Sequence, residues 1–216
     1  MHRIHITKHL AIFLITFFVA SLFYYILLNG GAFWRDLRYA LFLNSPFASN
    51  DLKNGDILKI NEAAASSLPN GQAQLIIPKL SVIAPIAIPR DESKQAILGS
   101  LEDGVGLYPG SGNLGEQGRM ILLGHSSRAT WYHGDYATIF TTIGHLEPMD
   151  EFYITANYKK YVYQVFAKKV LSPADTNALL EPLSLYTEVD LVTCYPIGGA
   201  SQRTIIQARM LRVENI

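Results

Sequence analysis

The sequence predicts an all-β domain, either a barrel or a sandwich, behind an apolar N-terminal segment. After Gln72, many short apolar and β-branched runs alternate with turn residues, and few stretches have helical spacing. No strand alternates regularly with a helix, which argues against a parallel α/β sheet. The uncharged run from Leu10 to Leu28 predicts a transmembrane helix, because at about 1.5 Å per residue it spans the ~30 Å hydrocarbon core.

Composition excludes several classes of function. The chain has 216 residues, a formal net charge of zero and no long basic run, so no nucleic-acid partner is expected. Cys194 is the only cysteine, which excludes an intramolecular disulfide and a zinc site built of several thiolates. The glycine-rich loop 104–118 lacks the Lys-Ser/Thr ending of a phosphate-binding loop, which argues against phosphate binding. We expect no cofactor and no metal.

Residues 1–71 are predicted to form an anchor and a linker. Residues 1–9 are a cytoplasmic tail, 10–28 the transmembrane anchor, and 29–71 a juxtamembrane helix and linker. The apolar run exceeds the ~7–15 residues of a signal-peptide core, which favours an uncleaved anchor, while the small residues of Gly30–Ala32 leave cleavage as the alternative. Positive charges are nearly balanced across the span, and its short N-terminal tail favours a single-pass cell-membrane protein with an extracytoplasmic domain.

Residues 72–216 are predicted to form the catalytic β domain. Pro78 and Pro85 interrupt its first two apolar runs, which predicts edge strands or bulges because proline cannot donate to a ladder. Helical spacing predicts one short helix over 91–101, and a second helix is expected to begin at the caps Asp175–Thr176.

The stretch from Val189 to Arg209 contains a possible nucleophile. An apolar run ends at Cys194, a Pro/Gly-rich turn follows, and a second apolar run opens at Arg203, which together predict a β-hairpin. Such a hairpin brings the thiol and the guanidinium together at its loop end. Nearby positive charge favours the thiolate, which is the nucleophilic form.

A base for this thiol is expected from a different strand. The apolar run 119–124 predicts a buried strand, and His125 follows directly at its end. His133 and His145 lie in loop-like surroundings and are less favoured. Catalytic Cys–His partners are adjacent in space rather than in sequence. The alternative for a lone cysteine is a small buried apolar side chain, and for an arginine a surface position on a strand.

Three motifs occur together in this chain. They are Leu191–Cys194 with an arginine nine positions later, Gly124–His125 after an apolar strand, and the opening Ile77–Leu80. In this combination, which spans roughly 74–213, the chain resembles the sortase family of cysteine transpeptidases. The resemblance implies a closed eight-stranded β-barrel with short helices. The Cys-Tyr-Pro sequence is similar to that of the smaller, non-pilus branches.

The resemblance also implies a role for each candidate residue. Cys194 would be the nucleophile, His125 the general acid/base, and Arg203 the group that stabilises the oxyanion and positions the substrate. The implied partners are secreted proteins with a sorting motif similar to Leu-Pro-x-Thr-Gly and an amine acceptor on a cell-wall precursor or another protein. A thioacyl enzyme would link the two half-reactions. A membrane anchor is implied as well, in agreement with the hydropathy.

Four acidic residues near the hairpin have uncertain roles. Asp190 stands four positions before the cysteine, where the family usually has Thr, and its carboxylate either disfavours the thiolate or pairs with a cation. Asp175, Glu181 and Glu188 could bind calcium as in some relatives, although a solvated loop is the more common explanation.

Two other functions fit the same sequence. A hydrolase would use the same three residues with water in place of the amine. A membrane-tethered binding domain would leave Cys194 inert and present Tyr161 and Tyr163, which alternation sets on one strand face, as its contact surface. The leucines of the connection 172–186 either receive the apolar part of a substrate motif or pack into the barrel.

Overall fold

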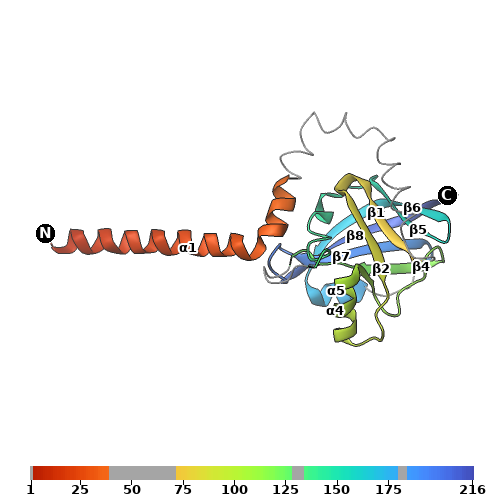
Figure 1. Ribbon diagram of the computed structural model, residues 1–216, viewed down its shortest axis with the longest axis horizontal. Helices are drawn as coiled ribbons and strands as arrows, with labels where there is room; N and C mark the ends of the chain where they lie inside the picture. The colour runs from red at the N-terminus through yellow and green to blue at the C-terminus, as the bar shows by residue number, and fades with distance from the viewer. Residues whose placement is uncertain (1, 39–71, 128–133, 180–183) are drawn as a thin grey trace, which may run out of the picture.

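The chain folds into a closed β-barrel preceded by a long helix (Figure 1). The computed structural model describes residues 2–38, 72–127, 134–179 and 184–216. The predicted linker, like His133, Glu181 and two of the leucines expected near the substrate groove (Leu180 and Leu183), lies outside the described residues.

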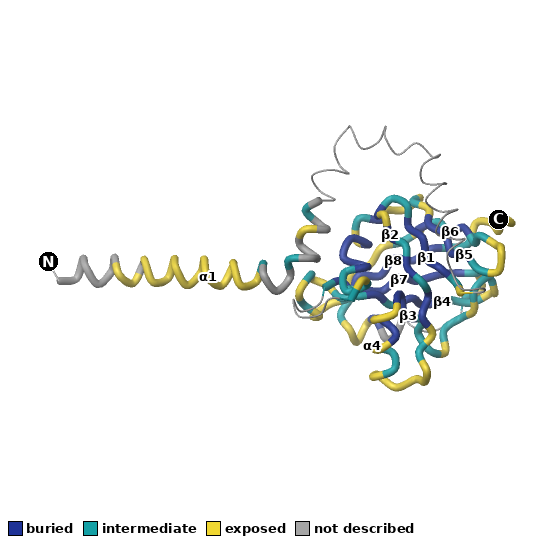
Figure 2. The backbone as a smooth tube through the Cα atoms, in the orientation of Figure 1, coloured by how far each residue is buried: buried dark blue, intermediate teal, exposed yellow. Residues whose placement is uncertain are grey.

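Helix α1 (His2–Arg38) includes the apolar run and the start of the predicted juxtamembrane helix in one element. It projects from the barrel, and its side chains from Ile12 to Tyr25 are exposed (Figure 2). Over the part of the chain that the structure describes, no helix is both long enough and apolar enough to cross a membrane. The Tyr25 hydroxyl donates to the carbonyl oxygen of Ile197 at 2.9 Å, so α1 contacts the barrel.

Eight strands close the barrel in the order β1-β2-β3-β4-β7-β8-β6-β5, and β1 pairs back with β5. Two neighbouring pairs, β2–β3 and β4–β7, are parallel, and the others are antiparallel. The bounds are β1 Gln74–Ile77, β2 Val82–Ala87, β3 Val105–Leu107, β4 Gly118–Leu123, β5 Glu151–Ala156, β6 Lys159–Leu171, β7 Thr187–Tyr195 and β8 Gln202–Asn215. The predicted all-β class and closed eight-stranded barrel are confirmed.

Closure of the barrel makes the prediction of edge strands wrong. Pro78 begins a 3-10 helix, η2 (Pro78–Leu80), rather than ending an edge strand. Pro85 lies within β2 opposite Gln74. The N–H that bonds to the preceding segment at this point is that of Ile86, which donates to the carbonyl of Ala73 at 2.8 Å, so the ladder does not need a donor from the proline. Part of the glycine-rich stretch predicted as a loop forms the short strand β3.

Short helices connect the strands. Helix α4 (Lys94–Asp103) forms where one was predicted and is capped by Ser93, whose hydroxyl accepts from the Ala96 N–H at 3.1 Å. Helix α5 (Pro173–Leu179) begins earlier than the predicted Asp175–Thr176 caps, because Ser172 caps it by accepting from the Asp175 N–H. Between β4 and β5 there is a short 3-10 helix, η3 (Ile143–His145).

The core fills the barrel interior with alternate residues of the strands. Phe152 and Tyr163 stack there with ring centroids 5.7 Å apart, and both side chains are fully buried. The expectation that Tyr161 and Tyr163 form an exposed contact face is therefore wrong. Alternation grouped these tyrosines correctly, but in a closed barrel that face points inward.

We predict that Leu191→Ala destabilises the fold by about 2–5 kcal/mol, because Leu191 is fully buried in the core and its truncation leaves a cavity. Leu211→Ala, on the neighbouring strand β8, is the matched control, since Leu211 is exposed. Chemical denaturation of the two variants measures the difference. Equal losses in both would contradict the assignment of Leu191 to the core.

Candidate active site

Cys194 and Arg203 face each other across a hairpin. Strands β7 and β8 are antiparallel neighbours, and Cys194 is the direct partner of Arg203 in their register. The cysteine is a free thiol with a partly exposed side chain. The hairpin predicted from the sequence is therefore confirmed, together with the proximity of these two residues.

His125 is brought to this pair by the parallel contact between β4 and β7. Leu123 of β4 is paired with Val192 of β7, and the Gly124 N–H continues the ladder by donating to the Val192 carbonyl at 3.1 Å. His125 and Cys194 each lie two residues beyond that last pair. Neighbouring strands are about 4.8 Å apart, so the histidine leaves β4 beside the end of β7 that carries the thiol.

Thr193, whose side chain points into the barrel, links the ends of β4 and β7 that lie next to His125 and Cys194. Its hydroxyl is buried and donates to the Gly124 carbonyl at 2.7 Å. Each of the two residues precedes a candidate catalytic residue. The bond therefore holds the backbone of His125 and the backbone of Cys194 at a set separation.

The residues around the thiol belong to the outer face of the barrel wall. Ile121, Val192 and Ile205 form an apolar cluster there, separate from the interior core. Because side chains alternate along a strand, Cys194 and Arg203, two positions from Val192 and Ile205, share this outer face. The apolar cluster thus lies directly along the strands from the thiol.

At the end of the barrel that carries Cys194, which we call the rim, a hydrogen bond joins two loops. The Gly198 N–H of the β7–β8 loop donates to Ser127 Oγ, in the loop after His125, at 2.8 Å. Arg203 Nη1 donates to the carbonyls of Ala200 and Gln202 at 2.9 and 2.8 Å, so its guanidinium is held by the turn it closes. These contacts orient the rim before any substrate binds.

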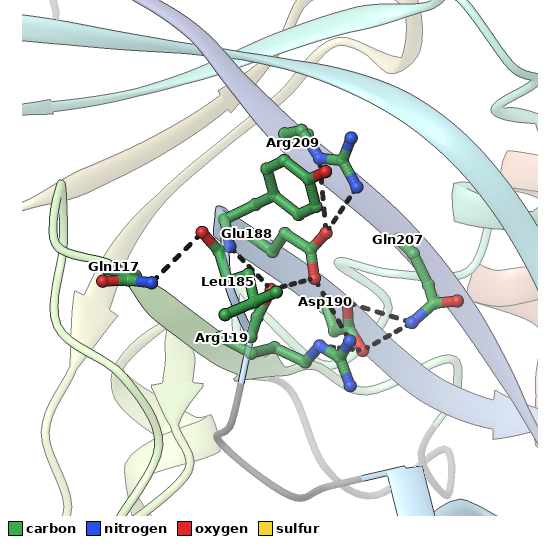
Figure 3. Close-up of polar contacts among 9 residues, drawn as sticks. Gln117, Arg119, Leu185, Glu188, Asp190, Gln207 and Arg209 are labelled. Carbon is green, nitrogen blue, oxygen red and sulfur yellow. Dashed lines mark hydrogen bonds and ion pairs between the residues drawn. The ribbon is translucent and has the colours of Figure 1, made fainter.

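Asp190 lies on the same outer face as Cys194, and a cation partly neutralises it. Its carboxylate accepts from Gln207 Nε2 at 3.2 Å and lies 3.7 Å from Arg119 Nε (Figure 3). Only 1% of the residue is exposed, and this burial raises its pKa to about 6 although Arg119 and Gln207 act in the opposite direction. Of the two roles expected for Asp190, pairing with a cation is the one observed.

Glu188 is held by two arginines rather than by a solvated loop. It accepts from Arg119 Nη2 at 3.1 Å and from Arg209 Nη2 at 3.0 Å, and Ser184 Oγ donates to it at 2.9 Å. Burial alone would raise the pKa of Glu188, but these hydrogen bonds keep it below its usual range. The expectation of a solvated loop is wrong for this residue, which belongs to β7.

Sequence reasoning did not find Arg119, Gln207 or Arg209. Arg119 precedes the apolar run of β4, and Gln207 and Arg209 alternate with apolar residues along β8, which was the available signal. No group of three or more His, Cys, Asp or Glu side chains able to hold a metal occurs among the residues described. His145, the less favoured histidine, lies half-buried in η3.

Comparison with known proteins identifies the family. A family model, the sortase domain, matches residues 75–211, from β1 into β8 and including all three candidate residues. The chain belongs to the sortase family. The resemblance noted from the three motifs is confirmed.

Individual sortases resemble the chain over about two thirds of its length. Sortase D of Bacillus subtilis (strain 168) is 31% identical over 144 residues, a match that covers 64% of this chain and 64% of that relative. Sortase C-1 of Actinomyces oris is 26% identical with a TM-score of 0.54, covering 65% of this chain and 71% of the other. Sortase E1 of Streptomyces coelicolor, solved with a tripeptide in its active site, is 26% identical with a TM-score of 0.53. That match covers 68% of this chain and 91% of the other.

We predict that Thr193→Val destabilises the sortase barrel by about 1–3 kcal/mol, because the buried Gly124 carbonyl loses its donor while the side-chain shape is kept. Thr193→Ser keeps the hydroxyl and is the control. Chemical denaturation measures both. A Val variant as stable as the wild type would contradict a stabilising role of the hydrogen bond.

We predict that Asp190→Asn makes stability less dependent on pH. The pKa of Asp190 in the folded chain, about 6, exceeds the ordinary 3.8, so its stabilising contribution is complete below about pH 4 and is lost as the pH rises through 6. At pH 7 the variant should exceed the wild type by up to about 3 kcal/mol, at 1.36 kcal/mol per pKa unit. Denaturation at a series of pH values measures this difference.

Glu188→Gln is the control with the opposite sign. The pKa of Glu188 is lowered, so its contribution is present above the ordinary pKa and is lost as the pH falls. This variant should be less stable than the wild type at pH 7. A difference between Asp190→Asn and the wild type that stays constant with pH would contradict the raised pKa.

Proposed function

We propose that the chain is a membrane-anchored cysteine transpeptidase that cuts a C-terminal sorting motif and transfers the acyl part to an amine. One observation carries the proposal: Cys194 is the direct strand partner of Arg203, at the rim where the parallel β4–β7 ladder ends in His125. Membership of the sortase family supports the same reaction class.

In the first half-reaction, His125 accepts the proton of the Cys194 thiol, and the sulfur attacks the carbonyl carbon of the scissile peptide bond. A C–S bond forms and the carbonyl oxygen takes up negative charge. Arg203 donates to that oxygen, with its guanidinium already oriented by the Ala200 and Gln202 carbonyls. The C–N bond then breaks, and His125 returns the proton to the departing amine.

In the second half-reaction an amine attacks the thioacyl carbon. A C–N bond forms, the C–S bond breaks, and His125 takes the proton of the incoming amine. The acceptor is an amine on a cell-wall precursor or on another protein. The partly buried apolar side chains packed on the cluster beside Cys194, which are Tyr108, Leu123 and Leu171, suit the apolar part of a motif similar to Leu-Pro-x-Thr-Gly.

Helix α1 is proposed as the membrane anchor, with the barrel on the extracytoplasmic side. The supporting observations are the uncharged run Leu10–Leu28 within this helix and the exposure of its apolar side chains from Ile12 to Tyr25. The domain would then work at the cell surface, where secreted proteins with a sorting motif pass.

We predict that the full chain joins a fluorescent sorting-motif peptide to an added amine, and that Cys194→Ala, His125→Ala and Arg203→Ala each reduce the rate by at least about a hundredfold. Arg203→Lys, which keeps the charge but not the fork of donors, is the matched control and should recover only part of the activity. Mass spectrometry of the amide product and of the thioacyl adduct measures both steps.

Three outcomes separate the alternatives. Release of the free acid with no amide at saturating amine indicates a hydrolase. A Cys194 that resists thiol-reactive labelling at neutral pH in the folded chain indicates an inert cysteine and a binding domain. Absence of both product and adduct across a library of peptides would overturn the transpeptidase proposal.

We predict that the full chain stays in the membrane fraction after extraction with high salt and alkaline carbonate, because an apolar helix is released only by detergent. A chain beginning at Gln72 is the control and should appear in the supernatant. Release of the full chain without detergent would contradict the anchor.

A further inference from the structure

Five side chains on the outer face of β4, β7 and β8 form one polar network (Figure 3). Its members are direct partners in the strand ladders. Arg119 is paired with Glu188, Glu188 with Arg209, and Asp190 with Gln207. The network therefore crosses β4, which ends two residues before His125, and the two strands that carry Cys194 and Arg203.

This network can hold β4 in one register against β7. No hairpin sets that register, because the two strands are parallel and distant in sequence. A slip of one residue would turn buried side chains outward. A slip of two residues keeps every apolar face but would separate His125 from Cys194 by roughly a further 7 Å. Matched polar partners on one face distinguish the observed register from the register slipped by two residues.

Asp190 occupies the position in the network nearest to the thiol. It lies four residues before Cys194 on the same face, with only Val192 between them on that face. Arg119 contacts its direct partner Glu188 and also reaches along β7 to within 3.7 Å of Asp190. Asp190 thus draws the guanidinium of β4 towards the catalytic end of β7.

We propose that ionised Asp190 is a positioning residue for the active site, holding Arg119 across β4 and β7 so that His125 and Cys194 stay in reactive register. The inference rests on the proposed transpeptidase function. When Asp190 gains a proton, its ion pair with Arg119 is lost, whereas the pairing of Arg119 with Glu188 remains.

Among the residues that the structure describes, the charged or polar groups that act on Asp190 belong to the same surface. These groups are Arg119 on β4, Glu188 on β7, Gln207 on β8 and Lys169 on β6. Burial raises the pKa of Asp190 to about 6, so its charge changes between about pH 5 and 7. The pKa of Glu188 is lowered, so that neighbour stays ionised over the same interval.

The proposed role of Asp190 depends on the charge of its side chain and not on the shape. An asparagine would fill the same space and could still accept a hydrogen bond from Gln207, without the cost of burying a carboxylate. Only the carboxylate attracts the guanidinium of Arg119. Asp190→Asn therefore removes the proposed role while keeping the local packing.

The test compares the wild-type full chain with Asp190→Asn in detergent micelles, measuring kcat/KM for acyl transfer from pH 5 to 8. At pH 7.5 the wild type should be faster by roughly tenfold or more, mainly in kcat, because the reacting groups are displaced in the variant. The ratio should fall towards one at pH 5, where the wild-type carboxyl is protonated. A ratio that stays constant with pH would mean a merely structural role and overturn the inference.

Two further variants sharpen the result. Glu188→Gln keeps Asp190 but removes a neighbouring negative charge that raises its pKa, so the acid inflexion of the rate should move to lower pH. Gln207→Met keeps Asp190 but removes a hydrogen bond that lowers its pKa, so the acid inflexion of the rate should move to higher pH. An inflexion that does not move would contradict the assignment to Asp190.

Alkylation of Cys194 by iodoacetamide, measured over the same pH range, needs no substrate. If the wild type makes no amide at any pH, the transpeptidase proposal fails. The positioning role is then decided by whether the alkylation ratio of wild type to Asp190→Asn changes through about pH 6. Near-UV circular dichroism at each pH confirms that the variants being compared are folded.

Discussion

The parallel pairing of β4 with β7 is the contact on which the site depends. It joins the strand that ends before His125 to the strand that carries Cys194, and no turn connects the two. A parallel ladder must be specified by side chains and by the rest of the fold, because its strands are joined only through a long crossover. In this barrel the apolar faces, the Thr193 hydroxyl and the charged partners at the other end of β7 share that task.

The three candidate residues reach the rim by two different routes. Cys194 and Arg203 are neighbours through a local hairpin, which a short segment of sequence can specify. His125 arrives from a distant segment through the parallel ladder and is held by the joined rim loops. The hairpin thus brings Cys194 and Arg203 together by itself, while the approach of His125 requires the closed barrel.

Asp190 shows how a buried charge can lower stability and still serve the site. Its carboxylate is almost fully buried, and the hydrogen bond and ion pair beside it only partly compensate for the lost hydration. Glu188, two residues earlier, is compensated by two arginines and a serine. Neighbouring carboxylates on one strand therefore have opposite pKa shifts, and they differ in how many donors surround them.

The elements that have local sequence signals could be predicted from the sequence alone. Turn residues and β-branched runs marked the strands, the helical spacing over 91–101 marked α4, and the Cys194–Arg203 hairpin followed from its Pro/Gly turn. Only the tertiary structure decided which strands are neighbours, and with that the inward face of Tyr163 and the partners of Asp190. Alternation groups residues onto a face, but whether a face is buried and which distant strand lies beside it depend on closure of the whole barrel.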